Sequence, residues 1–202
     1  MFVKICGLRD EEHVQIAVDA GADAVGFVFA KSVRRISPAR AASISSKVSG
    51  IVRKVAVMLH PSNEEWQEVL QAFTPDVLQT DAEDFSNLDV PAGVECWPVY
   101  REGNRVSGTF GVGSGVPDTY LYEGARSGSG EAVDWAGAAK IAEHGNMILA
   151  GGLGVANVAQ AISVARPFGV DVSSGVETAP GRKDSGLIRD FISAAKAAGN
   201  NL

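Results

Sequence analysis

Short runs of apolar residues alternate along this chain with longer stretches in which apolar residues recur every three or four positions. A short apolar run without polar alternation is typical of a strand that is buried on both faces of a sheet. A spacing of three and four is typical of a helix that buries one face. The runs that we predict as strands are residues 2–6, 22–29, 52–59, 75–79, 94–100, 119–123, 146–152 and 168–174.

Helix-start signals stand between several of these runs. Ser62 is followed three residues later by Glu65, which is the spacing of a capping box. Ser37 precedes Pro38, a residue type that suits the first position of a helix, and Asp10 is placed to cap a helix over the residues that follow it. Strand and helix signals that alternate through a whole chain predict a parallel sheet with right-handed crossovers.

The number of predicted strands indicates the fold class. Eight strands in 202 residues predict an α/β protein with a single compact (β/α)8 domain over residues 1–202, a TIM barrel near the minimum length for closure. The alternative is an open doubly wound sheet of flavodoxin-like order, and the strand count favours the barrel. Residues 101–118 are rich in glycine and lack helical periodicity, so we expect the fifth helix to be weak or missing.

Composition narrows the class of protein. Hydrophobic residues make up 46% of the chain, which argues against disorder, and a net charge of −6 argues against a nucleic-acid or anionic-membrane partner. No apolar run reaches the ~18 residues of a membrane span, and the first residues lack the pattern of a secretory signal. The two cysteines and three histidines show no metal-ligand spacing, so we expect reduced thiols, a cytoplasmic protein and no metal.

Two glycine-bearing segments mark the ends of the last two predicted strands. LAGGLG, residues 149–154, runs from a strand into a helix, and DVSSGVE, residues 171–177, leaves the next strand toward a predicted short helix. Such loops in a (β/α)8 barrel often bind phosphate, and the alternative is two turns that only close the barrel. A third glycine-rich stretch, residues 127–130, is a candidate cover for the site. The residues that we predict to bind phosphate are Gly151, Gly152, Ser173, Ser174 and Gly175.

Further candidate side chains follow other strand ends, where barrel enzymes collect their active sites. Cys6 has Lys4 on the same side of its strand, and a nearby positive charge would favour a thiolate base; a small buried hydrophobic residue is the alternative. Glu123 would act as an acid if burial raises its pKa, and a cap or an ion pair is the alternative. Arg34 can clamp a carboxylate or belong to a solvated basic turn. His60 is expected to be a loop residue.

One family pattern runs through several of these segments: VKICGL (3–8), FVFAKSVRRIS (27–37), KVAV (54–57), LAGGL (149–153) and above all GVDVSSGVETAPGRKD (169–184). Together they resemble the N-(5′-phosphoribosyl)anthranilate isomerases of tryptophan biosynthesis over essentially the whole chain. The resemblance implies a (β/α)8 barrel without a metal or an organic cofactor. It also implies an isomerase that converts a phosphorylated aminoaldose, a small-molecule substrate, into an aminoketose by an Amadori rearrangement. The oligomeric state that we expect is a monomer or a homodimer.

The resemblance implies roles position by position. Cys6 matches the general base that removes a proton from C2 of the sugar, and Arg34 matches the arginine that meets the carboxylate of anthranilate. Gly152 and the turn with Ser174 and Gly175 match the phosphate loops. Cys6 also favours a monofunctional enzyme, because relatives that serve the histidine pathway as well carry aspartate at this position.

Two positions depart from the family pattern. Glu123 in YLYE stands where the family has its general acid, an aspartate. The additional methylene displaces the carboxyl group, and a displacement of about 1 Å can cost about a hundredfold in rate. QTDA (79–82) replaces the family's QLHG, which makes Asp81 a reserve candidate for the acid. The alternatives are therefore a related aminoaldose-phosphate isomerase with histidine-pathway activity, or a non-catalytic barrel that binds a sugar phosphate.

Overall fold

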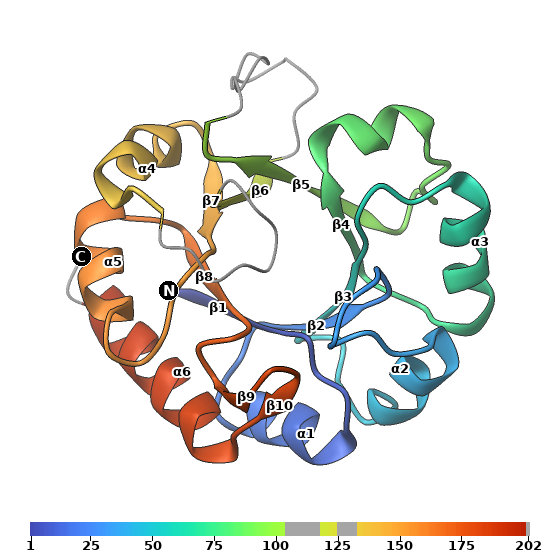
Figure 1. The fold of residues 1–202 in the computed structure, drawn as a ribbon, viewed down its shortest axis with the longest axis horizontal. Helices are drawn as coiled ribbons and strands as arrows, with labels where there is room; N and C mark the ends of the chain where they lie inside the picture. The colour runs from blue at the N-terminus through green and yellow to red at the C-terminus, as the bar shows by residue number, and fades with distance from the viewer. Residues whose placement is uncertain (104–117, 125–132, 201–202) are drawn as a thin grey trace.

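The strands of this protein close into one barrel. The computed structural model describes residues 1–103, 118–124 and 133–200 (Figure 1). The eight barrel strands are parallel, each pairs with the next along the chain, and β8 pairs with β1 to complete the ring, which confirms the predicted fold class and rejects the open sheet. These strands are β1 (Phe2–Cys6), β2 (Ala24–Val28), β3 (Arg53–Val57), β4 (Val77–Asp81), β5 (Glu95–Arg101), β6 (Thr119–Glu123), β7 (Asn146–Leu149) and β8 (Gly169–Val172).

Helices cover the outside of the barrel (Figure 1). The predicted caps are present: the Asp10 side chain accepts from the backbone N–H of His13, and Ser62 and Glu65 form a capping box. Pro38 occupies the first turn of its helix, as predicted. The described α-helices are α1 (Glu11–Asp19), α2 (Pro38–Ile44), α3 (Asn63–Ala72), α4 (Trp135–Ala142), α5 (Val158–Ala165) and α6 (Ser185–Gly199).

Two connections differ from a plain strand–helix repeat. After β4 the chain forms a 3-10 helix, η1 (Ala82–Asn87). After β8, where we predicted a short helix, it forms an antiparallel hairpin of β9 (Glu177–Ala179) and β10 (Arg182–Lys183), so that prediction is wrong. The expected weak fifth helix falls largely on residues 104–117 and the glycine-rich stretch on 127–130, and both lie outside the described residues.

Apolar residues form two layers, one on each side of the strands. The outer layer separates strands from helices and includes Trp66 of α3 and Phe191 of α6, which are fully buried. Because successive side chains of a strand point to opposite faces, the inward positions continue every second residue toward the strand ends. Asp81, Arg101 and Glu123 therefore face the C-terminal opening of the barrel, called the mouth below. The inner layer consists of Ala24, Val55, Val77, Trp97, Val99, Leu121 and Ile148.

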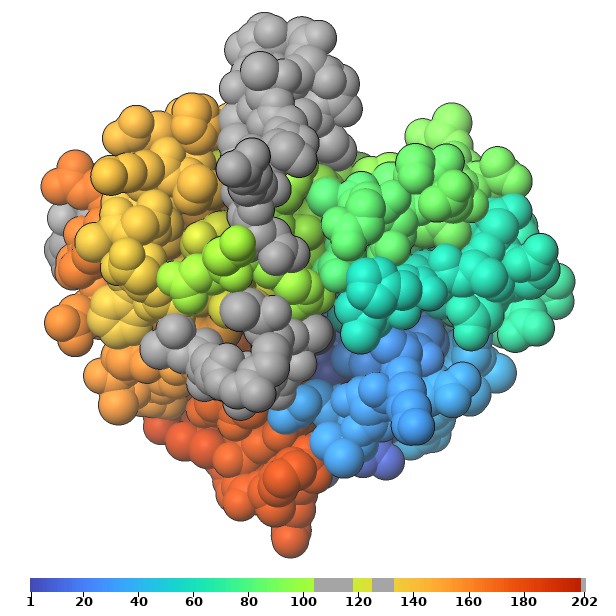
Figure 2. Space-filling view, turned by 45° about the horizontal axis from the view of Figure 1, so that its top comes forward, coloured from blue at the N-terminus to red at the C-terminus, as the bar shows by residue number. Residues whose placement is uncertain are grey.

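The first and last parts of the chain lie side by side. β1 pairs with β8, α1 packs against α6, and Figure 2 shows the early (blue) and late (red) parts of the chain next to each other on the surface. This closure brings residues from the start and the end of the sequence to the same side of the mouth. Among the described residues, no helix combines the length and apolar character needed to cross a membrane.

Candidate active site

Cys6 ends β1 at the mouth and is almost completely buried, with 7% of the residue exposed. Lys4, on the same face of the strand, is fully buried; its Nζ lies 2.9 Å from Oδ1 of Asp171 on β8, and its positive charge acts on the neighbouring thiol. Gly26 of β2 leaves room for both side chains, because a Cβ there would lie 3.1 Å from Sγ of Cys6 and 3.2 Å from Cε of Lys4. The packing therefore holds the thiol and the ammonium group together.

Opposing effects act on the proton of this thiol. Burial raises the pKa of Cys6 and prevails, although Lys4 and Lys183 both lower that pKa. Burial alone would lower the pKa of Lys4, but Asp171 and the thiol outweigh it, so the pKa of Lys4 is raised. Lys4 therefore stays charged, and a thiolate formed at Cys6 has a fixed cationic partner.

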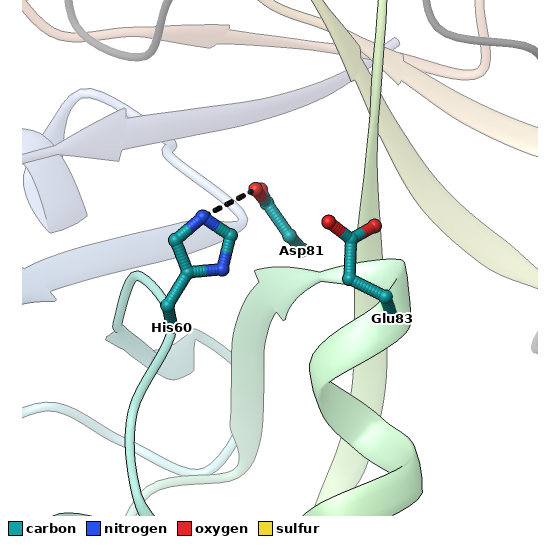
Figure 3. A group of neighbouring side chains, drawn as sticks. All are labelled: His60, Asp81 and Glu83. Atoms are coloured by element: carbon teal, nitrogen blue, oxygen red, sulfur yellow. Dashed lines mark ion pairs between the residues drawn. The ribbon is translucent and has the colours of Figure 1, made fainter.

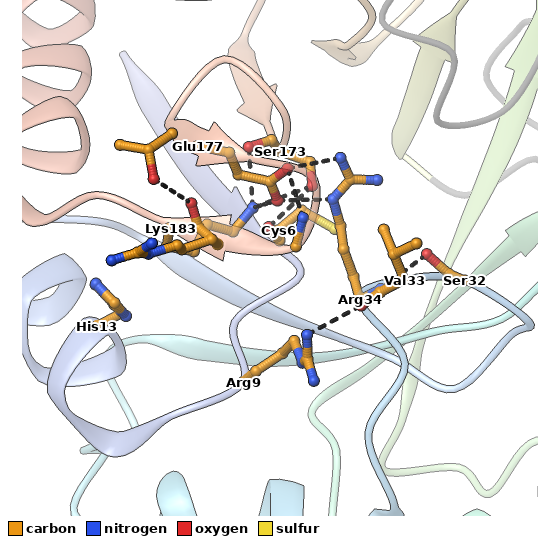
Figure 4. A network of polar contacts seen from close by, with 12 residues as sticks. Cys6, Arg9, His13, Ser32, Val33, Arg34, Ser173, Glu177 and Lys183 are labelled. Carbon is orange, nitrogen blue, oxygen red and sulfur yellow. Dashed lines mark hydrogen bonds and ion pairs between the residues drawn. The ribbon is translucent and has the colours of Figure 1, made fainter.

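Arg34 is tied to a carboxylate of the protein itself. Its Nε and Nη2 donate to the two carboxylate oxygens of Glu177 at 2.7 and 2.8 Å, and Nζ of Lys183 donates to Oε1 of Glu177 at 2.8 Å (Figure 4). Burial would raise the pKa of Glu177, but Arg34 and Lys183 lower it to about 2. We call Arg34, Glu177 and Lys183 the Glu177 group. It fixes the β9–β10 hairpin to the mouth.

Gly7 allows Arg34 to cross the end of β1. Its φ of +76° lies in the left-handed region, and a Cβ there would lie 2.7 Å from Cδ of Arg34 and 3.1 Å from Oγ of Ser173. Ser173 donates its hydroxyl to the carbonyl oxygen of Cys6 at 3.2 Å and accepts from Lys183 at the same distance. The structure thus brings Cys6, Arg34 and Ser173 together at the mouth.

The two glycine-bearing loops lie against each other after β7 and β8. Gly151 and Gly152 have φ values of +94° and +63°, which other residues rarely adopt. In the second loop, Gly175 forms a bridge to the first loop, and a Cβ on it would overlap the carbonyl oxygen of Leu153. Ser174 precedes Gly175 in this loop, and its carbonyl oxygen accepts from the backbone N–H of Glu177 at 3.1 Å. The predicted phosphate residues therefore form one continuous surface element.

The start of α5 belongs to the same element. Asn157 precedes α5, but its side chain folds back on the first loop: it donates to the carbonyl oxygen of Gly152 at 2.9 Å and accepts from the N–H of Gly154 at 2.8 Å. It makes no capping hydrogen bond to α5, whereas a side chain caps each of the other five described α-helices. Within the described parts of the chain, the first N–H groups of α5 thus lack a capping side chain.

On the other side of the mouth, one arginine lies between two carboxylates. Arg101 at the end of β5 donates through Nε and Nη2 to the two oxygens of Asp81, at 3.2 and 2.5 Å, and through Nη1 to Oε1 of Glu123. We call Asp81, Arg101 and Glu123 the Arg101 group. Burial raises the pKa of Glu123 and prevails, although Arg101 lowers that pKa. Both carboxylates were candidates from the sequence, but Arg101 was not. The signal for Arg101 is that it lies two residues after Val99, so its side chain points to the same inner face of β5.

His60 borders the Arg101 group from the loop after β3 (Figure 3). Its ring Nδ1 and its backbone N–H contact the Asp84 carboxylate at 3.0 and 3.2 Å, and its Nε2 lies 3.5 Å from Asp81. Potential ligand atoms of His60, Asp81 and Glu83 lie within 4.8 Å of one another. The guanidinium of Arg101 already binds both oxygens of Asp81 and repels a cation there, so we assign these side chains to the charge balance of the mouth.

Fold and site together define a class: (β/α)8-barrel enzymes that place acid–base side chains at the C-terminal ends of their strands. The sequence then identifies the family within that class. The sequence model of the N-(5′-phosphoribosyl)anthranilate (PRA) isomerases matches residues 3–194, and the chain belongs to this family.

Individual relatives agree over nearly full length. The N-(5′-phosphoribosyl)anthranilate isomerase of Streptococcus gordonii is 38% identical over 198 residues, which cover 96% of this chain and 97% of the relative. The crystal structure of the Thermus thermophilus isomerase has a TM-score of 0.82 at 28% identity and covers 98% of this chain and 99% of its own. A phosphoribosyl anthranilate isomerase solved with reduced 1-(o-carboxyphenylamino)-1-deoxyribulose 5-phosphate has a TM-score of 0.77 at 30% identity, with the same coverage.

Proposed function

We propose that this protein catalyses the Amadori rearrangement of N-(5′-phosphoribosyl)anthranilate to 1-(2-carboxyphenylamino)-1-deoxyribulose 5-phosphate in tryptophan biosynthesis. The observation that carries the proposal is that Cys6 and Glu123 face one mouth from β1 and β6, on nearly opposite sides of the barrel. The rearrangement needs an acid and a base around the same sugar. Because Cys6 must be a free thiol, we place the reaction in the reducing cytoplasm.

Glu123 is the general acid in this proposal. It gives its proton to the ring oxygen of the ribose, the bond between C1 and that oxygen breaks, and the anthranilate nitrogen forms a double bond to C1. A carboxyl group can do this only while it is protonated, and burial raises the pKa of Glu123 in that direction. Arg101 holds Oε1, and Oε2 has no partner among the described residues, so Oε2 is available to the substrate.

Cys6 is the general base. Its thiolate removes the proton from C2, the electron pair forms a C1–C2 double bond, and the electrons of the C1–N double bond return to nitrogen. The resulting enol becomes the ketone when C1 gains a proton and the C2 hydroxyl loses one. Lys4 supports this step because the charge of its ammonium group lowers the pKa of the thiol.

The two anionic ends of the substrate fit the remaining residues. Arg34 uses Nε and Nη2 for Glu177, and its Nη1, which has no partner in the described part of the chain, is available to the carboxylate of the anthranilate part. The phosphate fits the loops that carry Gly152 and Ser174, because the neighbouring N-terminus of α5 has no capping side chain among the described residues and favours an anion.

Turnover by the purified protein tests this proposal. Wild-type protein is expected to convert the aminoaldose into its ketose isomer, and chromatography separates the two. Cys6→Ala and Glu123→Gln are each expected to lose about a hundredfold or more in kcat/KM, since general acid–base groups contribute about 10²–10⁴-fold. Circular dichroism checks that both variants fold. Cys96→Ala is the matched control, because it removes a half-buried thiol from β5 and should leave turnover unchanged.

Two outcomes would contradict parts of the proposal. If Glu123→Gln remains active while Asp81→Asn is inactive, Asp81 is the acid. If the wild-type protein binds the reduced product saturably but shows no turnover, the barrel is a binding protein.

Complementation tests the substrate independently. The gene is expected to restore growth of a tryptophan auxotroph that lacks this isomerase, and to leave a histidine auxotroph that lacks the corresponding aminoaldose isomerase without growth. Growth of the histidine strain would show a wider specificity than the thiol at position 6 implies.

A further inference from the structure

We propose that Arg101 is a positioning residue that gives different roles to its two carboxylates: it holds Asp81 as an ionised partner and leaves Glu123 as the group that carries the transferable proton. The inference rests on the proposed function, because it concerns the general acid of that reaction. It concerns a residue to which neither the sequence motifs nor the family pattern gives a role.

The contacts of the two carboxylates are unequal. Asp81 receives two hydrogen bonds from Arg101, one on each oxygen, and the His60 ring lies 3.5 Å from one of those oxygens. Glu123 receives a hydrogen bond on Oε1 alone. Hydrogen bonds to the charged form favour ionisation, and a pair that engages both carboxylate oxygens is the stronger arrangement. Asp81 is therefore the better-stabilised anion of the two.

The charges around Glu123 favour one bound proton in the Arg101 group. When both carboxylates are ionised, two negative charges face the single positive charge of Arg101. Asp171 of β8 contributes a further negative charge toward Glu123, which the Lys4 ammonium group of β1, 2.9 Å from Asp171, partly balances. On the β7 side, the described chain continues into Ala150, which does not titrate. Like charges that share a site disfavour full ionisation, so the proton remains on Glu123, the carboxylate with fewer hydrogen bonds.

The strand register explains why arginine suits this position. Arg101 is paired with Glu123 in the register of β5 with β6, and it reaches back to Asp81, which is paired with Val99. The exposed fractions of the three side chains are 11% for Arg101, 8% for Asp81 and 15% for Glu123, so water screens these charges little. The planar fork of arginine can hold both neighbours at fixed angles, whereas a lysine offers one ammonium group.

The pH profile of kcat tests the inference through two single variants. In Asp81→Asn, all of the positive charge of Arg101 acts on Glu123, so its pKa should fall and the limb of the profile that reports this group should move to lower pH. In Arg101→Met, Glu123 loses its cation, so the same limb should move to higher pH. If Arg101 and Asp81 had only structural roles, Arg101→Met and Asp81→Asn would not shift the same limb in opposite directions.

Rates give a second readout. Arg101→Met is expected to lower kcat by about tenfold to a hundredfold with a smaller change in KM, because the acid is displaced while the binding residues remain. Arg101→Lys keeps the charge and loses the fork, so its limb should lie closer to wild type than that of Arg101→Met, with kcat still reduced. The double variant Asp81→Asn/Arg101→Met removes one charge of each sign, and its limb should return toward wild type.

Arg53→Met is the matched control. Arg53 also pairs with a carboxylate, Glu95, but at the opposite end of the barrel, where β3 and β5 begin. The Arg53→Met substitution should leave the pH profile and kcat unchanged. If wild type and Arg53→Met turn over the substrate while the Arg101 and Asp81 variants keep the wild-type kcat and limb positions, this inference is overturned and the proposed function stands. Absence of turnover in the wild type would instead overturn the proposed function.

Discussion

The two sides of the mouth use the same arrangement with the charges exchanged. In the Glu177 group, one carboxylate lies between two cations, Arg34 and Lys183. In the Arg101 group, one cation lies between two carboxylates. With all side chains ionised, the Glu177 group therefore has a net charge of one positive unit, on the side of β1, β2 and β8. The Arg101 group has a net charge of one negative unit, on the side of β4 to β6.

The sign of the surplus charge determines what each side is suited to do. The positive surplus lies beside Cys6 and can favour a thiolate or an anionic part of a substrate. The negative surplus favours retention of a proton, which a general acid needs. The first side also keeps the family motif, whereas the second departs from it at Asp81 and Glu123. In the proposed function, these departures preserve a proton-holding site with a different set of partners.

Breaking the buried pair beneath Cys6 should have the largest effect on stability. Lys4→Met leaves Asp171 without its partner, with the Asp171 side chain 9% exposed. Removal of one member of a buried pair costs about 3–5 kcal/mol in the free energy of unfolding, because the other charge stays buried. Urea unfolding at pH 7 measures this loss.

The double variant Lys4→Met/Asp171→Leu separates the two causes of that loss. Apolar residues in place of both charges should recover most of the unfolding free energy, since the desolvation cost disappears with the charges. Turnover should stay low in both variants, because the thiol loses its cation. If the unfolding free energy of Lys4→Met lies within about 1 kcal/mol of the wild-type value, which is the level of an exposed pair, the Lys4–Asp171 pair is effectively solvated.

The barrel and its helix caps could be predicted from the sequence because their signals are local. Ser62 and Glu65 are three residues apart, and Asp10 lies directly before its helix; both caps are present in the structure. Strand positions were also predicted, although the run 22–29 extends beyond β2 (Ala24–Val28) at both ends. Apolar residues continue into the turns there, and periodicity does not mark where strand pairing stops.

Contacts between distant parts of the chain could not be predicted in this way. Arg34 and Glu177 are 143 positions apart, and their pairing helps to hold the β9–β10 hairpin where we predicted a short helix. Arg101 lies outside every motif that we identified, and its contact with Asp81 depends on the register of β4 with β5. Hydrophobic patterns indicate which face of a strand is buried, but they do not indicate which polar side chains meet at its end.

Glu177→Gln sharpens the comparison on the positive side. The pKa of Glu177 is about 2 in the folded protein against an ordinary value of 4.5, so the carboxylate stabilises the fold fully above pH 4.5. As pH falls from 4.5 to 2, that contribution is lost. The variant should be less stable than wild type by about 1–3 kcal/mol near neutral pH, the cost of losing charged hydrogen bonds. Urea unfolding over a pH series should show the difference shrinking between pH 4.5 and 2, and a constant difference would exclude this ionisation as its source.

Arg53→Met gives the smallest expected effect and sets the scale for the others. Arg53 and Glu95 form a pair at 2.7 Å, a length similar to those in the mouth, but their side chains are 45% and 47% exposed. Water screens such a pair and the free side chains regain rotamer freedom, so exposed pairs contribute only about 0.2–1 kcal/mol. Urea unfolding should therefore place this variant within about 1 kcal/mol of wild type, and the difference should decrease further in high salt. A loss as large as that of Lys4→Met would mean that pair geometry, rather than burial, determines the cost, and it would remove the physical basis for treating the two charged groups of the mouth as special.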